Sequence, residues 1–169
     1  MLAPLGFVLA LSFGIQRMST ETAMALFWTY AAVMGLSLGS IFLVFTGESI
    51  ARVFFITAAT YGAMSLYGYT TRSDLSRFGS FLLMGLIGIV IASLVNIFVG
   101  SSALQFAISI IGVFVFLGLT AWDNQKLKKL ATVTGPQQEN VAVIGALALY
   151  LDFINLFLFL LRIFGDRRR

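Results

Sequence analysis

Long apolar runs alternate with short polar segments along this chain of 169 residues. Six of the runs approach or reach the ~20 residues that an α-helix needs to cross a bilayer. The segments between them are short, apart from residues 124–140, and none has the composition of a soluble domain. The pattern predicts an all-α, polytopic membrane helix bundle that forms one integral membrane domain over residues 1–169. The expected helices are residues 2–16, 23–45, 49–69, 79–99, 104–123 and 141–164.

The composition agrees, because 59% of the residues are hydrophobic, 11% are charged and the mean hydropathy is +0.97. A soluble domain of this size could not bury so much apolar surface. The chain has no cysteine and no histidine, which excludes disulfides, thiolate metal sites and catalysis by a histidine base. We expect no cofactor and no nucleic-acid partner, because the net charge of +4 comes from loop and tail clusters that report topology and anionic lipid.

Lysine and arginine are concentrated in alternate connections between the expected helices. The positive-inside rule places these connections in the cytoplasm. Six crossings then leave the C-terminal tail, GDRRR, on the opposite side, in conflict with its three arginines. Either the loops outweigh the tail or the last helix does not fully span the membrane, and we favour the loops. The residues concerned are Arg17, Arg72, Arg77, Lys126, Lys128 and Lys129.

Two local patterns have structural interpretations. Gly35 and Gly39 form a G-x-x-x-G step, which predicts close helix packing. Thr46 is expected to cap the helix that follows it, and Glu48 in the first turn suits the positive end of that helix. Glu48 and Arg52, four residues apart, are expected to pair.

The last expected helix contains a carboxylate inside an apolar run, ALYLDFINLFLFLLR, residues 148–162. Asp152 at this depth costs several kcal/mol unless it faces the bundle interior and finds partners. Asn155 is the one polar residue among its helical neighbours three and four positions away. Intramembrane acids mark ion or proton paths, and the alternative is a single buried hydrogen bond between helices.

Asp123 is the natural partner of Asp152. It ends the fifth expected helix, ~28 Å along it, near the cytoplasmic face, and Asp152 lies ~10 Å from the same face if its helix enters the membrane near residue 145. Two acids in contact in a poorly hydrated site cannot both ionise cheaply, so we expect them to share a proton and to respond to pH as a unit. Arg17, on the same side, could pair with one acid and latch the bundle shut, and protonation of that acid would weaken the latch.

The same segments resemble the transmembrane Bax inhibitor-1 motif family. ALYLDFINLFLFLLRIFG is similar to the C-terminal signature of the family, AWDNQKLKK to its preceding acidic site, and residues 46–88 to its central region. The resemblance covers essentially the whole chain. It implies a seven-helix fold with the last helix in the centre. This chain contains six of those helices, and residues 2–16 match the second helix of the family, so the first is expected to be missing.

The resemblance implies a pH-sensitive calcium leak, gated by an aspartate pair and an arginine latch, here Asp123, Asp152 and Arg17. Oxygen ligands suit a hard cation, and the two aspartates with Asn155 supply them as candidate metal ligands on the ion path. The resemblance alone selects calcium.

Three other functions compete with the calcium leak. A regulatory protein of the cell-death, stress or proteostasis type, which binds other membrane proteins, is the main alternative, and proton-coupled transport also stays open. An intramembrane aspartyl protease is disfavoured, because the chain has Y-L-D and T-A-W-D in place of Y-D and G-x-G-D, so we expect no enzyme activity. Simple loops and compact size favour the bacterial inner membrane.

Overall fold

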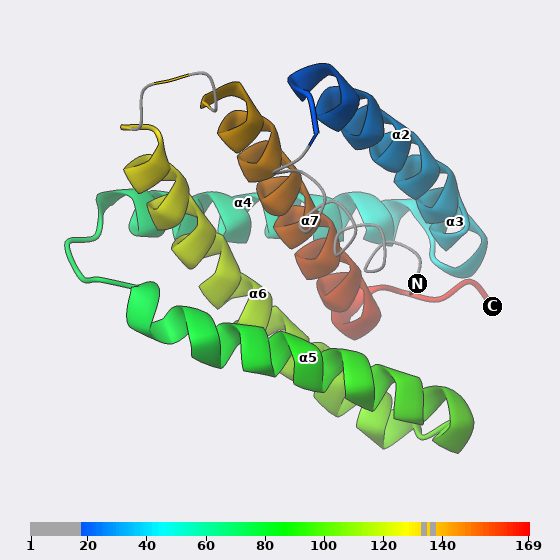
Figure 1. Ribbon diagram of the computed structural model, residues 1–169. Coiled ribbons are helices and arrows are strands. Elements are labelled where there is room, and N and C mark those ends of the chain that lie inside the picture. The colour runs from blue at the N-terminus through cyan, green and yellow to red at the C-terminus, as the bar shows by residue number, and fades with distance from the viewer. Residues whose placement is uncertain (1–17, 133–134, 136–137) are drawn as a thin grey trace.

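The computed structural model of the chain describes residues 18–132, 135 and 138–169. Over these residues it is a helical bundle (Figure 1), as predicted, and five segments are long and apolar enough to cross a membrane when α2 and α3 are taken together. The expected helix over residues 2–16, and Arg17, lie outside the described residues. The helices are α2 Thr20–Gly39, α3 Ile41–Val44, α4 Gly47–Thr70, α5 Ser76–Val99, α6 Ser102–Leu130 and α7 Gln138–Phe164.

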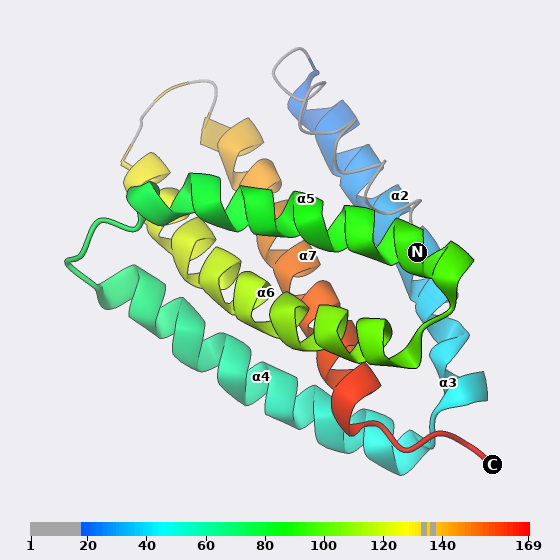
Figure 2. The same cartoon turned by 90° about the horizontal axis from the view of Figure 1, so that it is seen from below.

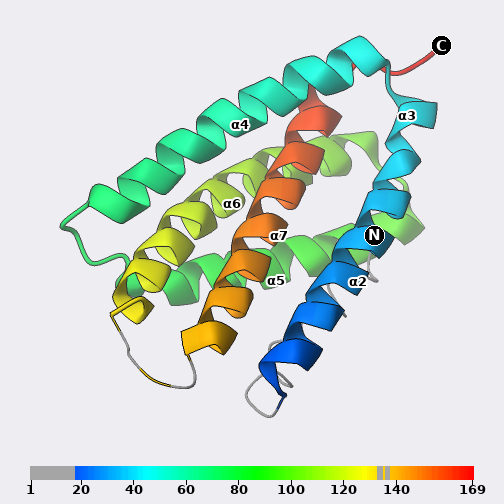
Figure 3. The same ribbon diagram turned by 90° about the horizontal axis from the view of Figure 1, so that it is seen from above.

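Helix α7 lies in the middle of the described bundle, between α2 on one side and α4 and α6 on the other (Figure 3). Half of its most apolar stretch is buried, which is the largest share among the five spans. Helix α5 packs against α6, and only 6% of its most apolar stretch is buried. Helix α5 is therefore the least buried of the five spans, while α6 and α7 are the most buried.

The helix ends form two groups on opposite sides of the bundle (Figures 2 and 3). The lysine end comprises the ends of α4 and α6 and the starts of α2, α5 and α7. The tail end comprises the starts of α4 and α6, the end of α5, and residues 165–169. The connections that the positive-inside rule assigns to the cytoplasm thus share one end, and the arginine-rich tail lies at the other. The lysine end contains Arg72, Arg77, Lys126, Lys128 and Lys129.

Helix α6 is longer than the sequence predicted. The expectation that it ends at Asp123 is wrong, because it continues to Leu130. The apolar pattern stops where the helix leaves the membrane, but the following NQKLKKL segment consists mostly of good helix formers. Lys128 and Lys129 in the last turn also suit the negative end of the helix dipole. Asp123 therefore lies inside a helix, where its backbone is already satisfied.

The predicted helix over residues 23–45 is interrupted at Ser40. Its hydroxyl donates to the carbonyl of Ser37 at 2.8 Å, and such back-bonding offers the backbone an alternative to the helical ladder. The close packing expected at Gly35 and Gly39 is absent among the described residues, since a Cβ at either position would meet nothing within 4 Å. Tight contacts occur instead at Gly68, Gly79, Gly112, Gly118 and Gly145.

The C-terminal tail is fastened to the connection between α3 and α4. The backbone N–H of Thr46 donates to the carbonyl of Asp166 at 3.0 Å, and that of Arg168 donates to Val44 at 2.8 Å. The side chain of Arg52 pairs with Asp166 at 2.9 Å. The expected pairing of Arg52 with Glu48 is therefore wrong, because the tail runs back across the start of α4 and brings a different carboxylate to Arg52.

Helix α4 begins as predicted. The hydroxyl of Thr46 accepts a hydrogen bond from the backbone N–H of Ser49 at 3.3 Å, and Glu48 lies in the first turn. The cap satisfies one of the backbone donors that every helix start leaves open.

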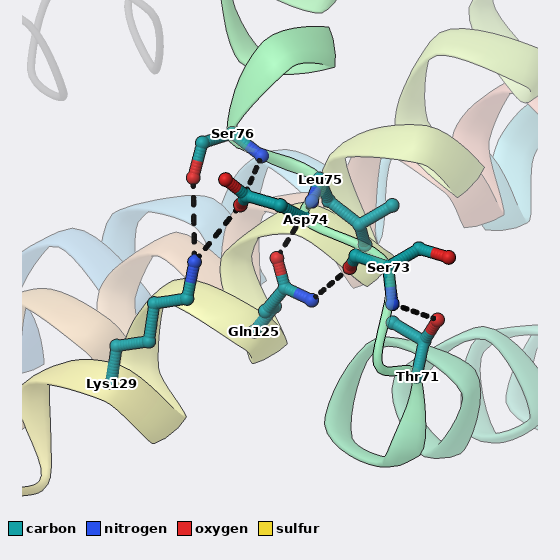
Figure 4. Close-up of polar contacts among 7 residues, drawn as sticks. All are labelled: Thr71, Ser73, Asp74, Leu75, Ser76, Gln125 and Lys129. Atoms are coloured by element: carbon teal, nitrogen blue, oxygen red, sulfur yellow. Dashed lines mark hydrogen bonds and ion pairs between the residues drawn. The ribbon is translucent and has the colours of Figure 1, made fainter.

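Gln125 of α6 holds the connection between α4 and α5 in place (Figure 4). Its side-chain oxygen accepts from the N–H of Leu75 at 2.8 Å, and its side-chain nitrogen donates to the carbonyl of Ser73 at 2.8 Å. Gln125 is 6% exposed, so its removal would leave both backbone groups without partners. We expect Gln125→Ala to lower the free energy of unfolding by about 2 kcal/mol, measured by denaturant unfolding in detergent.

A matched control is Gln105→Ala, because the side-chain amide of Gln105 makes no hydrogen bond with a described residue. Equal unfolding free energies for the two variants would show that the Gln125 contacts do not stabilise the connection.

Candidate functional site

Close contacts set the register between α6 and α7, which run antiparallel. A Cβ on Gly145 of α7 would collide with the side chain of Leu127. Further along, a Cβ on Gly112 of α6 would come within 2.8 Å of the ring of Phe159. Small residues thus let the two helices approach closely at two levels. The two aspartates predicted to form a pair lie between these levels, one on each helix.

The structure brings Asp123 and Asp152 together. Their carboxyl groups interact electrostatically and are close enough to hydrogen-bond with each other. Asp152 is 4% exposed, and Asp123 is partly buried. Asp123 is seven residues before Leu130, the last residue of α6. This separation corresponds to ~10 Å along the helix. The pair is therefore inside the bundle and nearer to the lysine end than to the tail end.

The two carboxyl groups meet in one buried contact. Oδ2 of Asp152 is buried and accepts no hydrogen bond from an N–H or hydroxyl group of a described residue, and the Asp152 carboxyl group instead hydrogen-bonds with that of Asp123. Ionised carboxylates offer only acceptor atoms, so this hydrogen bond requires a proton on one of the two groups. The contact between α6 and α7 therefore depends on protonation.

Tyr61 of α4 adds a third helix to the site. Its hydroxyl donates to the carbonyl of Leu149 at 3.2 Å, and its ring centroid lies 5.3 Å from that of Phe153. The hydroxyl is also within electrostatic reach of both Asp123 and Asp152. Tyr61 was not predicted from the sequence, because a tyrosine in a membrane helix is common and gives no local signal.

Two polar side chains extend the site toward the lysine end. The amide of Asn124 donates to the hydroxyl of Ser65 at 3.1 Å and to the carbonyl of Thr120 at 2.7 Å. Ser65 also interacts with the Tyr61 hydroxyl. Lys126, about one turn beyond the acidic pair on α6, contributes positive charge near Asp123. The pair is thus surrounded by neutral polar groups from α4 and α6, with a cation on the lysine side.

Asn155 lies on the other side of the pair. Its amide donates to the carbonyl of Leu151 in its own helix at 2.9 Å. Both residues line a cavity of about 830 Å³ that α2, α5, α6 and α7 enclose toward the tail end. Asp152 is less than one turn from Asn155, so the cavity approaches the acidic pair. The polar residues in its lining include Ser37, Ser40, Ser93, Asn96, Gln105, Asn155 and Arg162.

The structure thus describes only some of the residues of the predicted site. The structure positions Asp123, Asp152 and Asn155, whereas Arg17, the expected latch, lies outside the described residues. Within the described ranges no three acidic, histidine or cysteine side chains gather as metal ligands. The pair itself offers two carboxylates.

Sequence comparison identifies the family. The profile described as "Inhibitor of apoptosis-promoting Bax1" matches residues 1–169. The chain belongs to the Bax inhibitor-1 family. The resemblance recognised in the YLDFINLF and AWDNQKLKK segments is thereby confirmed.

Bacterial members of the Bax inhibitor-1 family are close relatives. The inner membrane protein YbhL of Escherichia coli is 54% identical over 171 residues, which cover 99% of this chain and 73% of YbhL. A Rickettsia prowazekii protein is 53% identical over 170 residues, 99% of this chain and 72% of its own. A Streptococcus pyogenes membrane protein is 42% identical over 153 residues, 90% and 67% of the two chains. Together with the five spans, these relatives place this Bax inhibitor-1 protein in the bacterial inner membrane.

Proposed function

We propose that this protein is a pH-sensitive calcium leak in which the Asp123–Asp152 pair forms the gate. The observation that supports the proposal is the meeting of two carboxyl groups from adjacent helices inside the bundle, one of them almost fully buried. A proton shared between two such groups joins the helices, and its loss leaves two like charges in contact. Protonation of the pair therefore changes the interaction between α6 and α7.

The cavity supplies one half of an ion path. It lies toward the tail end and is lined partly by hydroxyl and amide groups, which are suitable ligands for a hard cation. The acidic pair lies between this cavity and the lysine end, ~10 Å from the end of α6. An ion that crosses the bundle along α7 would pass from Asn155 to Asp152 and Asp123.

The ligand set suits a passing ion better than a stored one. Calcium takes about six to eight oxygen ligands when it is held tightly, and the pair supplies two carboxyl groups. Asn155 and water in the cavity would supply the remaining oxygens. We therefore propose calcium as the transported ion, with Asp123, Asp152 and Asn155 as transient ligands, and we propose no resident cofactor and no peptidase activity.

The pair predicts the direction of the pH response. The shared proton holds α6 and α7 together at low pH, and repulsion between two carboxylates favours separation at high pH. Calcium flux is therefore expected to be higher at pH 8 than at pH 5. A latch between Arg17 and one acid would give the opposite order, because protonation would then release the latch.

The proposal is tested with purified protein in liposomes that contain a calcium-sensitive dye, at several pH values from 5 to 8. We expect calcium entry above that of protein-free liposomes, with a rate that depends on pH. Folded protein without calcium entry would contradict the leak. It would favour the alternative role, a regulatory protein that binds other membrane proteins, and cross-linking in the native membrane would then identify the partners.

A further inference from the structure

A second, smaller cavity lies at the lysine end, where the start of α5 meets the last turns of α6. Its volume is about 200 Å³. Its chemistry differs from that of the acidic pair, because its lining includes two lysines and no carboxylate. One of these lysines, Lys126, also contributes positive charge near Asp123. The lining residues are Ser76, Trp122, Gln125, Lys126 and Lys129.

The walls of this cavity are held firmly. The ring of Trp122 packs so closely on α5 that a Cβ on Gly79 would come within 2.7 Å of it. Gln125 is fixed by its two hydrogen bonds to the α4–α5 connection, as Figure 4 shows. Lys129 donates to Asp74 at 3.0 Å and to the Ser76 hydroxyl at 3.4 Å. The cavity is thus formed by the packing of two helices and not by an exposed loop alone.

The two lysines differ in how their charges are matched. Hydrogen bonds from Ser76 and Lys129 lower the pKa of Asp74 to about 2, so Asp74 stays ionised and partners Lys129. Lys126 makes no ion pair with a described residue, and its ammonium lies 5.1 Å from the centroid of the Trp122 ring. The lining therefore has a net positive charge, and Lys126, whose charge also acts on Asp123, is exposed and placed to meet an anion.

We propose that this cavity binds the phosphate headgroup of an anionic phospholipid in the leaflet at the lysine end. A basic cavity between membrane helices, beside an interfacial tryptophan, suits such a headgroup. The adjoining helix provides the acyl-chain surface, since α5 is the least buried of the five spans and exposes Phe78 and Phe81 by 57% and 68%. Free phosphate has the same anionic chemistry, but it would make no use of this apolar surface.

The test compares two lysines of the same helix end. Native mass spectrometry of the purified protein in detergent measures how much dioleoylphosphatidylglycerol is retained, with dioleoylphosphatidylcholine as the neutral lipid. Lys126→Gln is expected to reduce phosphatidylglycerol retention about fivefold, and Lys126→Arg is expected to preserve it. Lys128→Gln is the matched control, because Lys128 points to α4, where its ammonium donates to the carbonyl of Tyr69 at 2.7 Å.

Three results would overturn the proposal. The first is equal retention by the unmodified protein and Lys126→Gln. The second is an equal loss in Lys126→Gln and Lys128→Gln, which would show a diffuse effect of surface charge. The third is displacement of the lipid by millimolar inorganic phosphate, which would assign the cavity to a free anion. Elution of all variants as folded protein in size-exclusion chromatography is required in each comparison. The outcome is independent of calcium flux.

Discussion

Asp152→Asn is expected to abolish the pH response of calcium flux while the protein remains folded. Asparagine is nearly isosteric with aspartate but cannot ionise, so the contact with Asp123 can no longer change from a shared proton to charge repulsion. The flux should stay near the pH 5 level of the unmodified protein at every pH from 5 to 8. One lost proton-linked interaction of about 1.4 kcal/mol corresponds to a tenfold change in the open population, so the ratio of fluxes at pH 8 and pH 5 should fall from about ten to about one.

The same calcium-flux assay distinguishes the effect of the Asp123–Asp152 pair from that of other acidic residues. Asp123→Asn should have the same effect, and the double variant should add little, because the two residues act as one titrating unit. Asp74→Asn is the matched control. The lowered pKa of Asp74, about 2 against 3.8, means that its stabilising charge is present above pH 3.8 and lost only as the pH falls through about 2. Asp74 therefore does not titrate between pH 5 and 8, and its variant should keep the full pH response.

A folded Asp152→Asn protein with an unchanged pH response would contradict the proposed gate. A loss of response in Asp74→Asn as well would show that the assay reports charge at the membrane surface. Circular dichroism and size-exclusion profiles establish whether each variant is folded before the fluxes are compared.

The sequence predicted the helical bundle because bilayer thickness and backbone hydrogen bonding leave few alternatives to apolar helices. It also pointed to the acidic pair, since Asp152 stands alone in an apolar run and an isolated charge there needs a partner. Both predictions rest on a local contrast in polarity. For the helices it is the contrast between apolar runs and short polar segments, and for the pair it is the contrast between Asp152 and its apolar neighbours. The membrane makes such a contrast strong, because a misplaced charge is costly.

Contacts between polar residues that are far apart in the sequence are not marked by such a contrast in polarity. Gln125 stands in a polar segment, NQKLKK, so nothing in the sequence marks it as buried against Ser73 and Leu75. Asp166 lies in a charged tail, and its pairing with Arg52 depends on how that tail returns to α4. Tyr61 was missed for a related reason, because its hydroxyl comes within electrostatic range of the acidic pair only after α4 has packed against α6 and α7.

Glycine spacing also failed to locate the close contacts. A G-x-x-x-G step shows that two glycines share a helix face, but it does not show whether another helix packs on that face. Gly35 and Gly39 have no close neighbour among the described residues, whereas Gly68 approaches the backbone of α6. The choice between them depends on tertiary arrangement.

Gly68→Ala is expected to separate α4 from α6. A Cβ at this position would lie 2.7 Å from the Cα and 2.8 Å from the carbonyl carbon of Ala121, and it would collide with the carbonyl oxygen of the same residue. Backbone atoms cannot rotate away as a flexible side chain can, so the two helices must move apart. We expect the free energy of unfolding in detergent to fall by about 3 kcal/mol or more.

Gly62→Ala is the matched control, because it lies on the same helix and its Cβ would meet nothing within 4 Å. Alanine favours a helix over glycine by up to about 1 kcal/mol, so this variant should be as stable as the unmodified protein or slightly more stable. Equal stability of the two variants would show that the contact between Gly68 and Ala121 does not hold α4 in place.

The position of Gly68 connects stability to the proposed gate. Ala121 is two residues from Asp123, and α4 also carries Tyr61, whose hydroxyl lies within electrostatic range of both carboxyl groups. Displacement of α4 would therefore change the surroundings of the acidic pair without altering either aspartate. At temperatures where Gly68→Ala remains folded, we expect its calcium flux to depend less on pH than that of Gly62→Ala. Full retention of the pH response would show that the gate requires α6 and α7 alone.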